Sequence, residues 1–386
     1  MKMLVLLNSL RVSGTEQLMT QVSAILSQRG HQVALFPLVT PFDDCYVEQL
    51  KANGVYDLVF FPRWVTSFDK LIWKANAFFV RTFGYALREK ILLRWLKNFC
   101  TRNKVQLIIS NSHTTDSFIL PLINESLKLV IIEHGSYVDK ILNGLPFDER
   151  PLQKAECVIG VSRWTSSVLQ ARFNSKGVRT IYNGHVVNRN GKMSERLKYW
   201  LKSSQAPVFA MHGRGAEQKG WSIAFEAIEL VRQKGFDVRF LVMSEGEFID
   251  KLAFQHRGDH IFVNGFSYNL PEIIEHVFAG LLPSIGFETF GLSALDYMAM
   301  GKPVLASMVG GLPELVMHNG QPGGVILPVK EGGRLDPMTL AEAMIKLLTD
   351  TNYYQALATS AKTISASYTM ERCADQYEQT LSELIS

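Results

Sequence analysis

Short apolar runs alternate with helical patterns along the whole chain, and they fall into two series. The first series consists of Met3–Asn8, Val33–Leu38, Asp57–Phe61, Leu107–Asn111, Leu129–His134 and Cys157–Ser162. The second consists of Val208–Gly213, Val238–Met243, His260–Val263, Ala279–Leu282, Pro303–Ser307 and Val325–Leu327. Continuous apolar runs of this length are typical of parallel strands that are buried on both faces. Two series of alternating strands and helices therefore predict two doubly wound α/β domains.

The predicted first domain covers residues 1–185 and the second covers residues 207–368. The stretch between them, residues 186–206, is polar and basic, so we predict a linker there. A last helical pattern covers residues 369–386 and follows Tyr368.

Composition adds few constraints. The 386 residues are 47% hydrophobic and 20% charged, an ordinary globular balance. The four cysteines are scattered and form no C-x-x-C pair, which favours neither a zinc site nor a disulfide framework and is compatible with a reducing cytoplasm. The opening apolar run is better explained as a first strand than as a signal peptide. No apolar run reaches the roughly 20 residues of a membrane-spanning helix, so we expect a cytoplasmic protein.

The charge is distributed unevenly. Residues 1–180 contain 22 Lys/Arg and 14 Asp/Glu, whereas residues 181–386 contain 18 and 22. Most of the basic excess lies in residues 51–104, with 11 basic and 3 acidic residues. A one-sided basic lobe suggests an anionic partner such as a membrane surface, a nucleic acid or an anionic glycolipid.

Basic and aromatic residues are interleaved in residues 63–104, where Gly84 is a candidate boundary between two helices. The basic positions at helical spacing are Lys70, Lys74, Arg81, Arg88, Lys90, Arg94 and Lys97, and the aromatic ones include Trp73, Phe78, Phe79, Phe83, Tyr85 and Trp95. One interpretation is an ordinary amphipathic helix with a solvated basic face. The other is an interfacial helix that makes peripheral contact with an anionic membrane, here the inner face of the plasma membrane. We expect no nucleic-acid partner, because no recognisable nucleic-acid module is present.

The most informative stretch is residues 282–302. The apolar run Ala279–Leu282 ends at a loop that carries Glu288, and Gly291 then opens a helical pattern that ends at Gly301. The backbone N–H groups at such a helix start form an anion site. Glu288 and Asp296 lie on either side of that start, where each could bind hydroxyl groups. A pyrophosphate with a sugar at each end, that is a nucleotide sugar, fits this arrangement.

Residues 287–316, F-E-T-F-G-L-S-A-L-D-Y-M-A-M-G-K-P-V-L-A-S-M-V-G-G-L-P-E-L-V, resemble the signature of the retaining glycosyltransferases of family four. The resemblance implies the GT-B fold, in which two Rossmann-like domains face a cleft. It also implies that Glu288 holds the hydroxyls of the donor sugar and that the backbone at Phe290, Gly291 and Leu292 holds the pyrophosphate. The family has two Glu separated by seven residues, and Asp296 occupies the second position. Asp is one methylene shorter, which affects the ribose contact that the family assigns there.

Other segments resemble the same family. Ser13–Gly14–Thr15–Glu16 resembles its Gly-Gly-Ala-Glu turn, so Gly14 is a candidate backbone contact to the donor phosphate or the acceptor; a capping box of Ser13 and Glu16 is the structural alternative. His134 follows a buried strand at the place where the family has a His beside the donor sugar, although a lone His is often structural. His113 is a weaker candidate.

A third segment, A-M-H-G-R-G-A-E-Q-K-G, resembles the family's Gly-Arg…Lys-Gly turn, with Arg214 and Lys219 as the matching cations. Two cations can offset the charge of a departing nucleoside diphosphate without a metal ion; the alternative is a pair of solvated loop charges. Ser244–Glu247 and the segment from Val263 through Gly265 to Phe266 resemble loops on the nucleobase side. Glu314, in a Gly-Gly-Leu-Pro-Glu turn, is a less favoured ligand.

These observations together predict a retaining, metal-independent hexosyltransferase that needs no cofactor beyond its nucleotide-sugar substrate, with a UDP-sugar favoured. Glu288, His134, Arg214 and Lys219 are the candidate catalytic residues, and no covalent nucleophile is assigned. The expected acceptor is a cell-envelope glycolipid or polysaccharide, such as lipopolysaccharide, capsule or teichoic acid. A sugar-nucleotide epimerase on the same fold and a catalytically inactive nucleotide-sugar-binding scaffold are the alternatives.

Overall fold

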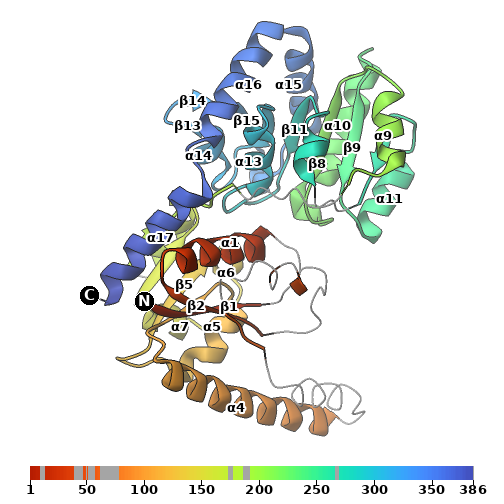
Figure 1. Cartoon of the computed structure of the whole chain (residues 1–386). Coiled ribbons are helices and arrows are strands. Elements are labelled where there is room, and N and C mark those ends of the chain that lie inside the picture. The colour runs from red at the N-terminus through yellow and green to blue at the C-terminus, as the bar shows by residue number, and fades with distance from the viewer. Residues whose placement is uncertain are drawn as a thin grey trace. The chain divides into compact units, whose positions relative to one another are not determined.

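The computed structural model describes residues 1–8, 14–38, 47–48, 50, 57–60, 78–172, 177–185, 192–265 and 269–385, with the backbone alone for residues 78–86. Ser13, Phe266, Cys45, Trp73 and the basic positions Lys70 and Lys74 lie outside the described residues, as do the first six residues of the predicted linker. The chain divides into two compact units (Figure 1). Unit 1 comprises Met1–Gly184 and Met370–Ser386, and unit 2 comprises His185–Thr369.

Unit 1 is built on a parallel sheet with the strand order β3-β2-β1-β4-β5-β6-β7. Its strands are β1 (Lys2–Leu7), β2 (Gln32–Pro37), β3 (Asp57–Leu58), β4 (Leu107–Ser110), β5 (Lys128–Glu133), β6 (Cys157–Gly160) and β7 (Val178–Thr180). The first six confirm the apolar runs of the first series. The edge strand β7 was not predicted, because its three residues are only half-buried and do not form an apolar run.

Helices cover both faces of this sheet. They are α1 (Gly14–Gln28), α4 (Phe78–Asn103), α5 (His113–Ile119), α6 (Ser136–Leu142), α7 (Arg150–Lys154), α8 (Arg163–Arg172) and α17 (Met370–Ile385). The C-terminal helix α17 packs against α1, and Arg29 just after α1 lies 2.7 Å from both Asp375 and Glu378 of α17. The last helix of the chain thus belongs to unit 1.

Helix α4 runs without a break through Gly84, so the predicted boundary between two helices at this position is wrong. One glycine inside a helix costs only about 1 kcal/mol, and tertiary packing outweighs that cost. Leu92, Leu96 and Cys100, spaced four residues apart, are buried against the sheet. The opposite face exposes Lys90, Arg94 and Lys97 to solvent.

Unit 2 has a second parallel sheet, with the order β10-β9-β8-β11-β12-β15. Its strands are β8 (Val208–His212), β9 (Arg239–Met243), β10 (Ile261–Val263), β11 (Ala279–Leu282), β12 (Val304–Ser307) and β15 (Gly324–Leu327); β13 (Met317–His318) and β14 (Gln321–Pro322) form a separate hairpin. The helices are α9 (Glu195–Lys202), α10 (Trp221–Gln233), α11 (Glu247–Gln255), α12 (Leu270–Ile274), α13 (Leu292–Ala299), α14 (Leu312–Val316), α15 (Pro337–Thr349) and α16 (Thr351–Ser365). The second series of apolar runs is confirmed, and with it the prediction of two doubly wound α/β domains.

Part of the predicted linker is a helix of unit 2. Helix α9 buries Leu197, Trp200 and Leu201, which are spaced i, i+3 and i+4 and form one apolar face. The Trp200 Nε1 donates a hydrogen bond of 2.8 Å to the carbonyl oxygen of Asp259, and the guanidinium of Arg239 lies 4.4 Å from the centre of the Trp200 ring. The segment was predicted to be a linker because Lys and Arg residues surround these three positions. The apolar face of the helix is nevertheless buried in unit 2.

Candidate active site

The strand order of unit 2 reverses between β8 and β11, which are neighbours in the sheet but not in the sequence. In doubly wound sheets, ligands bind at the carboxyl ends of the strands beside this switch point. The segment 213–220 follows β8 and the segment 283–291 follows β11. These two segments contain the predicted residues Arg214, Lys219, Glu288 and Gly291.

Lys219 and Glu288 are in direct contact. The Nζ of Lys219 lies 2.5 Å from the Oε2 of Glu288, and the two side chains are 26% and 15% exposed. The hydroxyl of Ser284 lies 3.4 Å from the same carboxylate oxygen. The structure thus brings together the predicted phosphate-binding cation and the predicted sugar-binding acid in one partly buried pair.

The segment that carries Lys219 packs closely against the segment that follows strand β11. Gly220 has φ of 75°, and a Cβ at this position would overlap the carbonyl oxygen of Pro283. The N–H of Ile285 donates a 2.8 Å hydrogen bond to the carbonyl of Gln218. Only glycine allows the two segments to approach this closely, so Gly220 sets the position of Lys219.

Glu288 is held in place by Gly310 and Gly311. The N–H of Gly311 donates a 2.7 Å hydrogen bond to the carbonyl oxygen of Glu288. Gly310 has φ of 58°, and a Cβ there would overlap that same carbonyl oxygen. These two glycines therefore support Glu288, a link that the sequence does not reveal because Gly310 is 22 positions away.

Arg214 presents an exposed side chain from a fixed backbone. The indole N–H of the buried Trp221 donates a 2.8 Å hydrogen bond to the Arg214 carbonyl. Within the described part of the chain, no ion pair within 4.0 Å engages the Arg214 guanidinium. An arginine whose backbone is fixed and whose guanidinium forms no ion pair can bind two oxygens of a phosphate group.

Gly291 caps the start of α13 in the left-handed conformation, with φ of 99°. A Cβ on Gly291 would lie 2.6 Å from a methyl carbon of Leu312. The Phe290 side chain is buried and contacts the Tyr368 ring edge-on at 5.7 Å. Phe290 and Leu292 can therefore offer a ligand their backbone groups, as the first turn of a helix does.

Asp296 is bracketed by two histidines. Its Oδ2 lies 2.9 Å from the Nε2 of His212, and its Oδ1 lies 3.2 Å from the Nε2 of His185. Burial raises the pKa of Asp296, but the hydrogen bonds from His185 and His212 outweigh that effect and lower the pKa overall. Neither histidine could be predicted from the sequence as a neighbour of Asp296, because the three residues come from different parts of the chain.

The predicted nucleobase side lies along the ends of β9 and β10. Gly265 has φ of 70°, and a Cβ there would lie 4.0 Å from the Oε2 of Glu245. Gly215 packs on the backbone of the same Glu245, where a Cβ would lie 2.5 Å from the carbonyl oxygen. The Ser244 hydroxyl is buried, with no hydrogen-bond partner among the described residues. The Gly215 turn and the Glu245 loop are therefore neighbours.

His134 and Gly14 belong to unit 1. Gly14 is the exposed first residue of α1. His134 follows β5, and burial lowers its pKa to about 4, so its imidazole is neutral near pH 7. The preceding residue, Glu133, is fully buried and accepts backbone hydrogen bonds from Gly135, Tyr137 and Val138. This network fixes the backbone on either side of His134.

Two family models match consecutive parts of this chain. The model described as Glycosyltransferase Family 4 matches residues 12–189, and the model described as Glycosyl transferases group 1 matches residues 206–350. The chain belongs to this glycosyltransferase family. The second match contains Arg214, Lys219, Glu288 and Asp296, and the resemblance read from the sequence is confirmed.

Similar proteins match either a part of the chain or nearly all of it. The probable glycogen synthase of Methanocaldococcus jannaschii is 33% identical over 122 residues, which cover 29% of this glycosyltransferase and only 22% of that protein. The N-acetyl-alpha-D-glucosaminyl L-malate synthase of Bacillus anthracis is 22% identical over 385 residues, which cover 95% of this chain and 93% of that protein. The crystal structure of Anabaena Alr3699/HepE in complex with UDP and glucose has a TM-score of 0.74 at 20% identity. The match covers 99% of this chain and 100% of that one. The fold is therefore GT-B.

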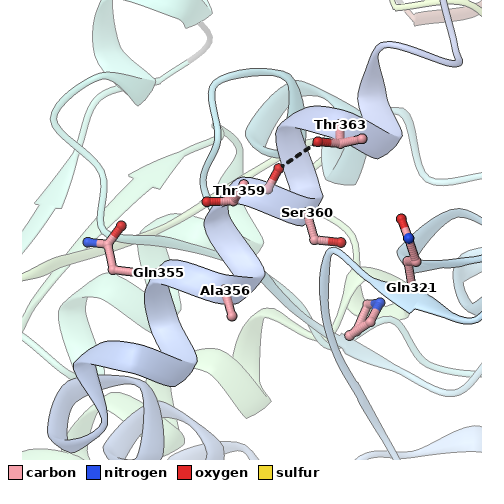
Figure 2. Close-up of a pocket in the computed structure, with 7 residues that line it drawn as sticks. Gln321, Gln355, Ala356, Thr359, Ser360 and Thr363 are labelled. Carbon is pink, nitrogen blue, oxygen red and sulfur yellow. Dashed lines mark hydrogen bonds between the residues drawn. The ribbon is translucent and has the colours of Figure 1, made fainter.

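A cavity of about 600 Å³ lies elsewhere in unit 2 of the glycosyltransferase (Figure 2). Gln321 and Pro322 of β14 line it together with α16 residues that include Gln355 and Thr359. The lining contains amides and hydroxyls but no titratable side chain. None of the candidate active-site residues borders this cavity, and Glu314 lies on α14 outside it.

Proposed function

We propose that this glycosyltransferase moves a hexosyl group from a nucleotide sugar to an acceptor hydroxyl with retention of the anomeric configuration. The observation that carries the proposal is the contact between Lys219 and Glu288 at the switch point of unit 2. A cation for a diphosphate and an acid for sugar hydroxyls stand side by side. The exposed Arg214 and the first turn of α13 belong to the same two segments.

In the proposed complex, the donor replaces the contact between Lys219 and Glu288. Lys219 turns to the diphosphate, and Glu288 accepts hydrogen bonds from hydroxyls of the sugar. Lys219, Arg214 and the backbone N–H groups at Gly291 and Leu292 then offset the charge that develops on the departing diphosphate. We propose that these groups do the work that a divalent metal ion does in other transferases.

We further propose that transfer takes place on one face of the sugar. The bond from the anomeric carbon to the phosphate oxygen breaks while the acceptor oxygen bonds to the same face. The acceptor proton passes to the departing phosphate, so no protein nucleophile is required. His134, neutral because burial lowers its pKa to about 4, is suited to hydrogen-bond the sugar rather than to supply a positive charge. Gly14 would make a backbone contact to the donor or the acceptor.

Two observations support narrower proposals. The similar fold of Anabaena Alr3699/HepE, solved with UDP and glucose, favours a UDP-sugar as the donor. The exposed Lys90, Arg94 and Lys97 on α4 favour an anionic or membrane-borne acceptor, such as a cell-envelope glycolipid or polysaccharide. No helix in the described ranges is long and apolar enough to cross a membrane, so we propose peripheral contact with the membrane surface.

A donor screen tests the proposal. A panel of UDP-, GDP- and ADP-sugars is incubated with the protein, and both sugar release and the melting temperature are recorded. We expect one donor to be hydrolysed slowly and to raise the melting temperature, with the sugar first released in the anomeric configuration of the donor. Release of UDP with epimerisation of the sugar would point to an epimerase. The absence of any melting shift, even with UDP or GDP, would contradict the proposal.

A further inference from the structure

The carboxylate of Asp296 is already engaged on both oxygens. His212 approaches Oδ2 and His185 approaches Oδ1, each through its Nε2, and the three side chains are only 10–19% exposed. Since a carboxylate can only accept, each Nε2 must carry the hydrogen. Asp296 therefore holds two imidazoles in fixed orientations, with much of its hydrogen-bonding capacity used.

The cluster adjoins the proposed diphosphate site on two sides. His212 ends β8 and directly precedes Gly213 and Arg214. Its carbonyl oxygen accepts a 3.2 Å hydrogen bond from the hydroxyl of Ser293, in the first turn of α13. Asp296 lies on the same helix, less than one turn beyond Ser293.

His212 also has a vacant ring nitrogen. Its Nδ1 is buried and has no hydrogen-bond partner among the residues that the structure describes. Buried polar atoms are normally paired, so an orphaned one in a native structure calls for a partner. In the imidazolium form Nδ1 carries a hydrogen, and an anionic oxygen is the acceptor that best satisfies it.

We propose that His185 and His212 are donor-site residues held in place by Asp296, and that protonated His212 donates a hydrogen bond to the diphosphate of the nucleotide sugar. This inference rests on the proposed function. Asp296 acts through the imidazoles as a positioning residue, in place of the direct ribose contact that the sequence resemblance implies for it.

The charge of the cluster supports this assignment. With both imidazoles neutral the cluster carries one negative charge, and with both protonated it carries one positive charge. Histidine is the side chain that changes charge between about pH 5 and 8. We therefore expect a diphosphate to bind more tightly when the imidazoles are protonated.

Other ionisable groups also surround the cluster, and the test variants leave them unchanged. Tyr297 contacts the His212 ring at 5.0 Å between centroids, and burial raises its pKa well above 10, so it stays neutral. The helices that pack on α13 contribute Glu272, Glu314 and Lys362, and Arg214, Lys219 and Glu288 belong to the adjoining segments.

The test measures dissociation constants by calorimetry between about pH 5.5 and 8.5. The probes are UDP-glucose, whose diphosphate keeps its charge in this range, and uridine, which has none. For the wild type we expect UDP-glucose to bind about tenfold more tightly at the acid end, as one favourable charge contact predicts. Uridine should show no such slope. The variants His212→Gln and Asp296→Asn should lose the slope, and His185→Gln should reduce it.

The control is His318→Gln. His318 lies in the same unit, and its Nδ1 is 2.9 Å from the hydroxyl of Tyr368, whose carbonyl accepts a hydrogen bond from the His185 backbone. His260→Gln is therefore added as a second control, because the Nε2 of His260 lies 2.9 Å from the Oε1 of Glu229, away from the cluster. Both control variants should keep the wild-type slope. The melting temperature of each variant without ligand shows that it is folded, and His185→Gln provides a second route if His212→Gln does not fold.

Three results would overturn the inference while leaving the proposed function standing. They are an unchanged pH slope in His212→Gln, the same slope with uridine, and tight binding of UDP-glucose that does not depend on pH in the wild type. A different result, in which the wild type binds neither UDP-glucose nor GDP-mannose at any pH, would remove the proposed function itself.

Discussion

Lys219 and Glu288 are 69 residues apart in the sequence, and their side chains meet at 2.5 Å. Each would be costly to leave alone in a partly buried site, because an unpaired charge loses solvation. Pairing them satisfies both charges, and in the proposed complex a donor with complementary charge and hydroxyl groups replaces this contact. The pair is therefore the residue-scale basis of the proposed transfer.

Replacing either member should abolish turnover. In Lys219→Ala the diphosphate loses a cation, and in Glu288→Ala the sugar loses its acid, so we expect kcat/KM to fall at least 100-fold, which corresponds to about 3 kcal/mol of transition-state stabilisation. The measurement is steady-state transfer or donor hydrolysis. Lys330→Ala is the matched control: Lys330 forms a 2.9 Å pair with Asp336 but is 72% exposed, and its loss should leave the rate unchanged. Near-normal rates in both site variants would refute the site.

At the scale of the element, glycine turns set the geometry of the loop that carries Glu288. Gly310→Ala should lower kcat/KM, because the new Cβ overlaps the Glu288 backbone and displaces the carboxylate from its place beside Lys219. Gly235→Ala is the control: it also has positive φ, at 89°, but its Cβ would meet nothing within 4 Å. Gly235→Ala should lose about 1–2 kcal/mol of unfolding free energy from backbone strain, and Gly310→Ala should lose more because its Cβ also overlaps the Glu288 backbone. Equal activities in the two variants would contradict this account.

Helix α4 combines a buried face with an exposed basic one. If that basic face contacts anionic lipid, the triple variant Lys90→Glu, Arg94→Glu, Lys97→Glu should lose co-sedimentation with phosphatidylserine liposomes, since each basic residue near such a surface contributes about 1 kcal/mol. The exposed Lys202, Lys234 and Lys251 of unit 2, changed to Glu together, make the same change in charge and serve as the control for charge alone. Wild-type protein that stays in the supernatant would leave α4 as an ordinary amphipathic helix.

Local sequence patterns predict some of the helices and miss others. The helix after Gly291 was predicted because its apolar residues recur along one face and a glycine stands at each end. Helix α9 was missed because lysines and arginines surround three buried residues, and a short amphipathic segment between domains resembles a linker. The continuity of α4 through Gly84 depends on packing against the sheet, which no local pattern records.

At the scale of the whole molecule, the two parallel sheets follow from the apolar runs, because strands buried on both faces leave a strong signal. The family resemblance then placed Arg214, Lys219 and Glu288. It did not reveal that Asp296 meets His212, 84 residues away, or that it meets His185. Contacts between distant segments depend on tertiary structure, and the histidines had no motif of their own.

Unit 1 also contains a buried acid that should make the stability of the molecule depend on pH. Asp116 is fully buried and accepts a 2.8 Å hydrogen bond from the hydroxyl of Tyr137. Burial raises its pKa to about 7, and burial likewise raises that of Glu133 to about 7. Both values lie above those of an unfolded chain, about 4. The protonated acids therefore contribute fully to the free energy of unfolding below about pH 4, and this contribution is lost as the pH rises through 7.

We expect the unfolding free energy to fall between pH 6 and pH 8, by about 1 kcal/mol for each of the two acids. Asp116→Asn, which keeps the shape but not the charge, should remove its share of this slope and leave that of Glu133. Asp148→Asn is the control, because Asp148 pairs with Arg150, which lowers its pKa. Urea unfolding followed by circular dichroism at the two pH values measures the difference, and an unchanged slope in Asp116→Asn would show that Asp116 stays ionised.

The most direct test of the central claim is the binding of UDP to the wild type and to the double variant Arg214→Ala, Lys219→Ala, measured by calorimetry at one pH and low salt. We predict that the wild type binds UDP more tightly than uridine, and that the double variant loses most of this preference because the two cations of the proposed diphosphate site are gone. If wild type and double variant bind UDP equally, or if neither binds it, the switch point of unit 2 is not a diphosphate site and the proposed transfer has no donor.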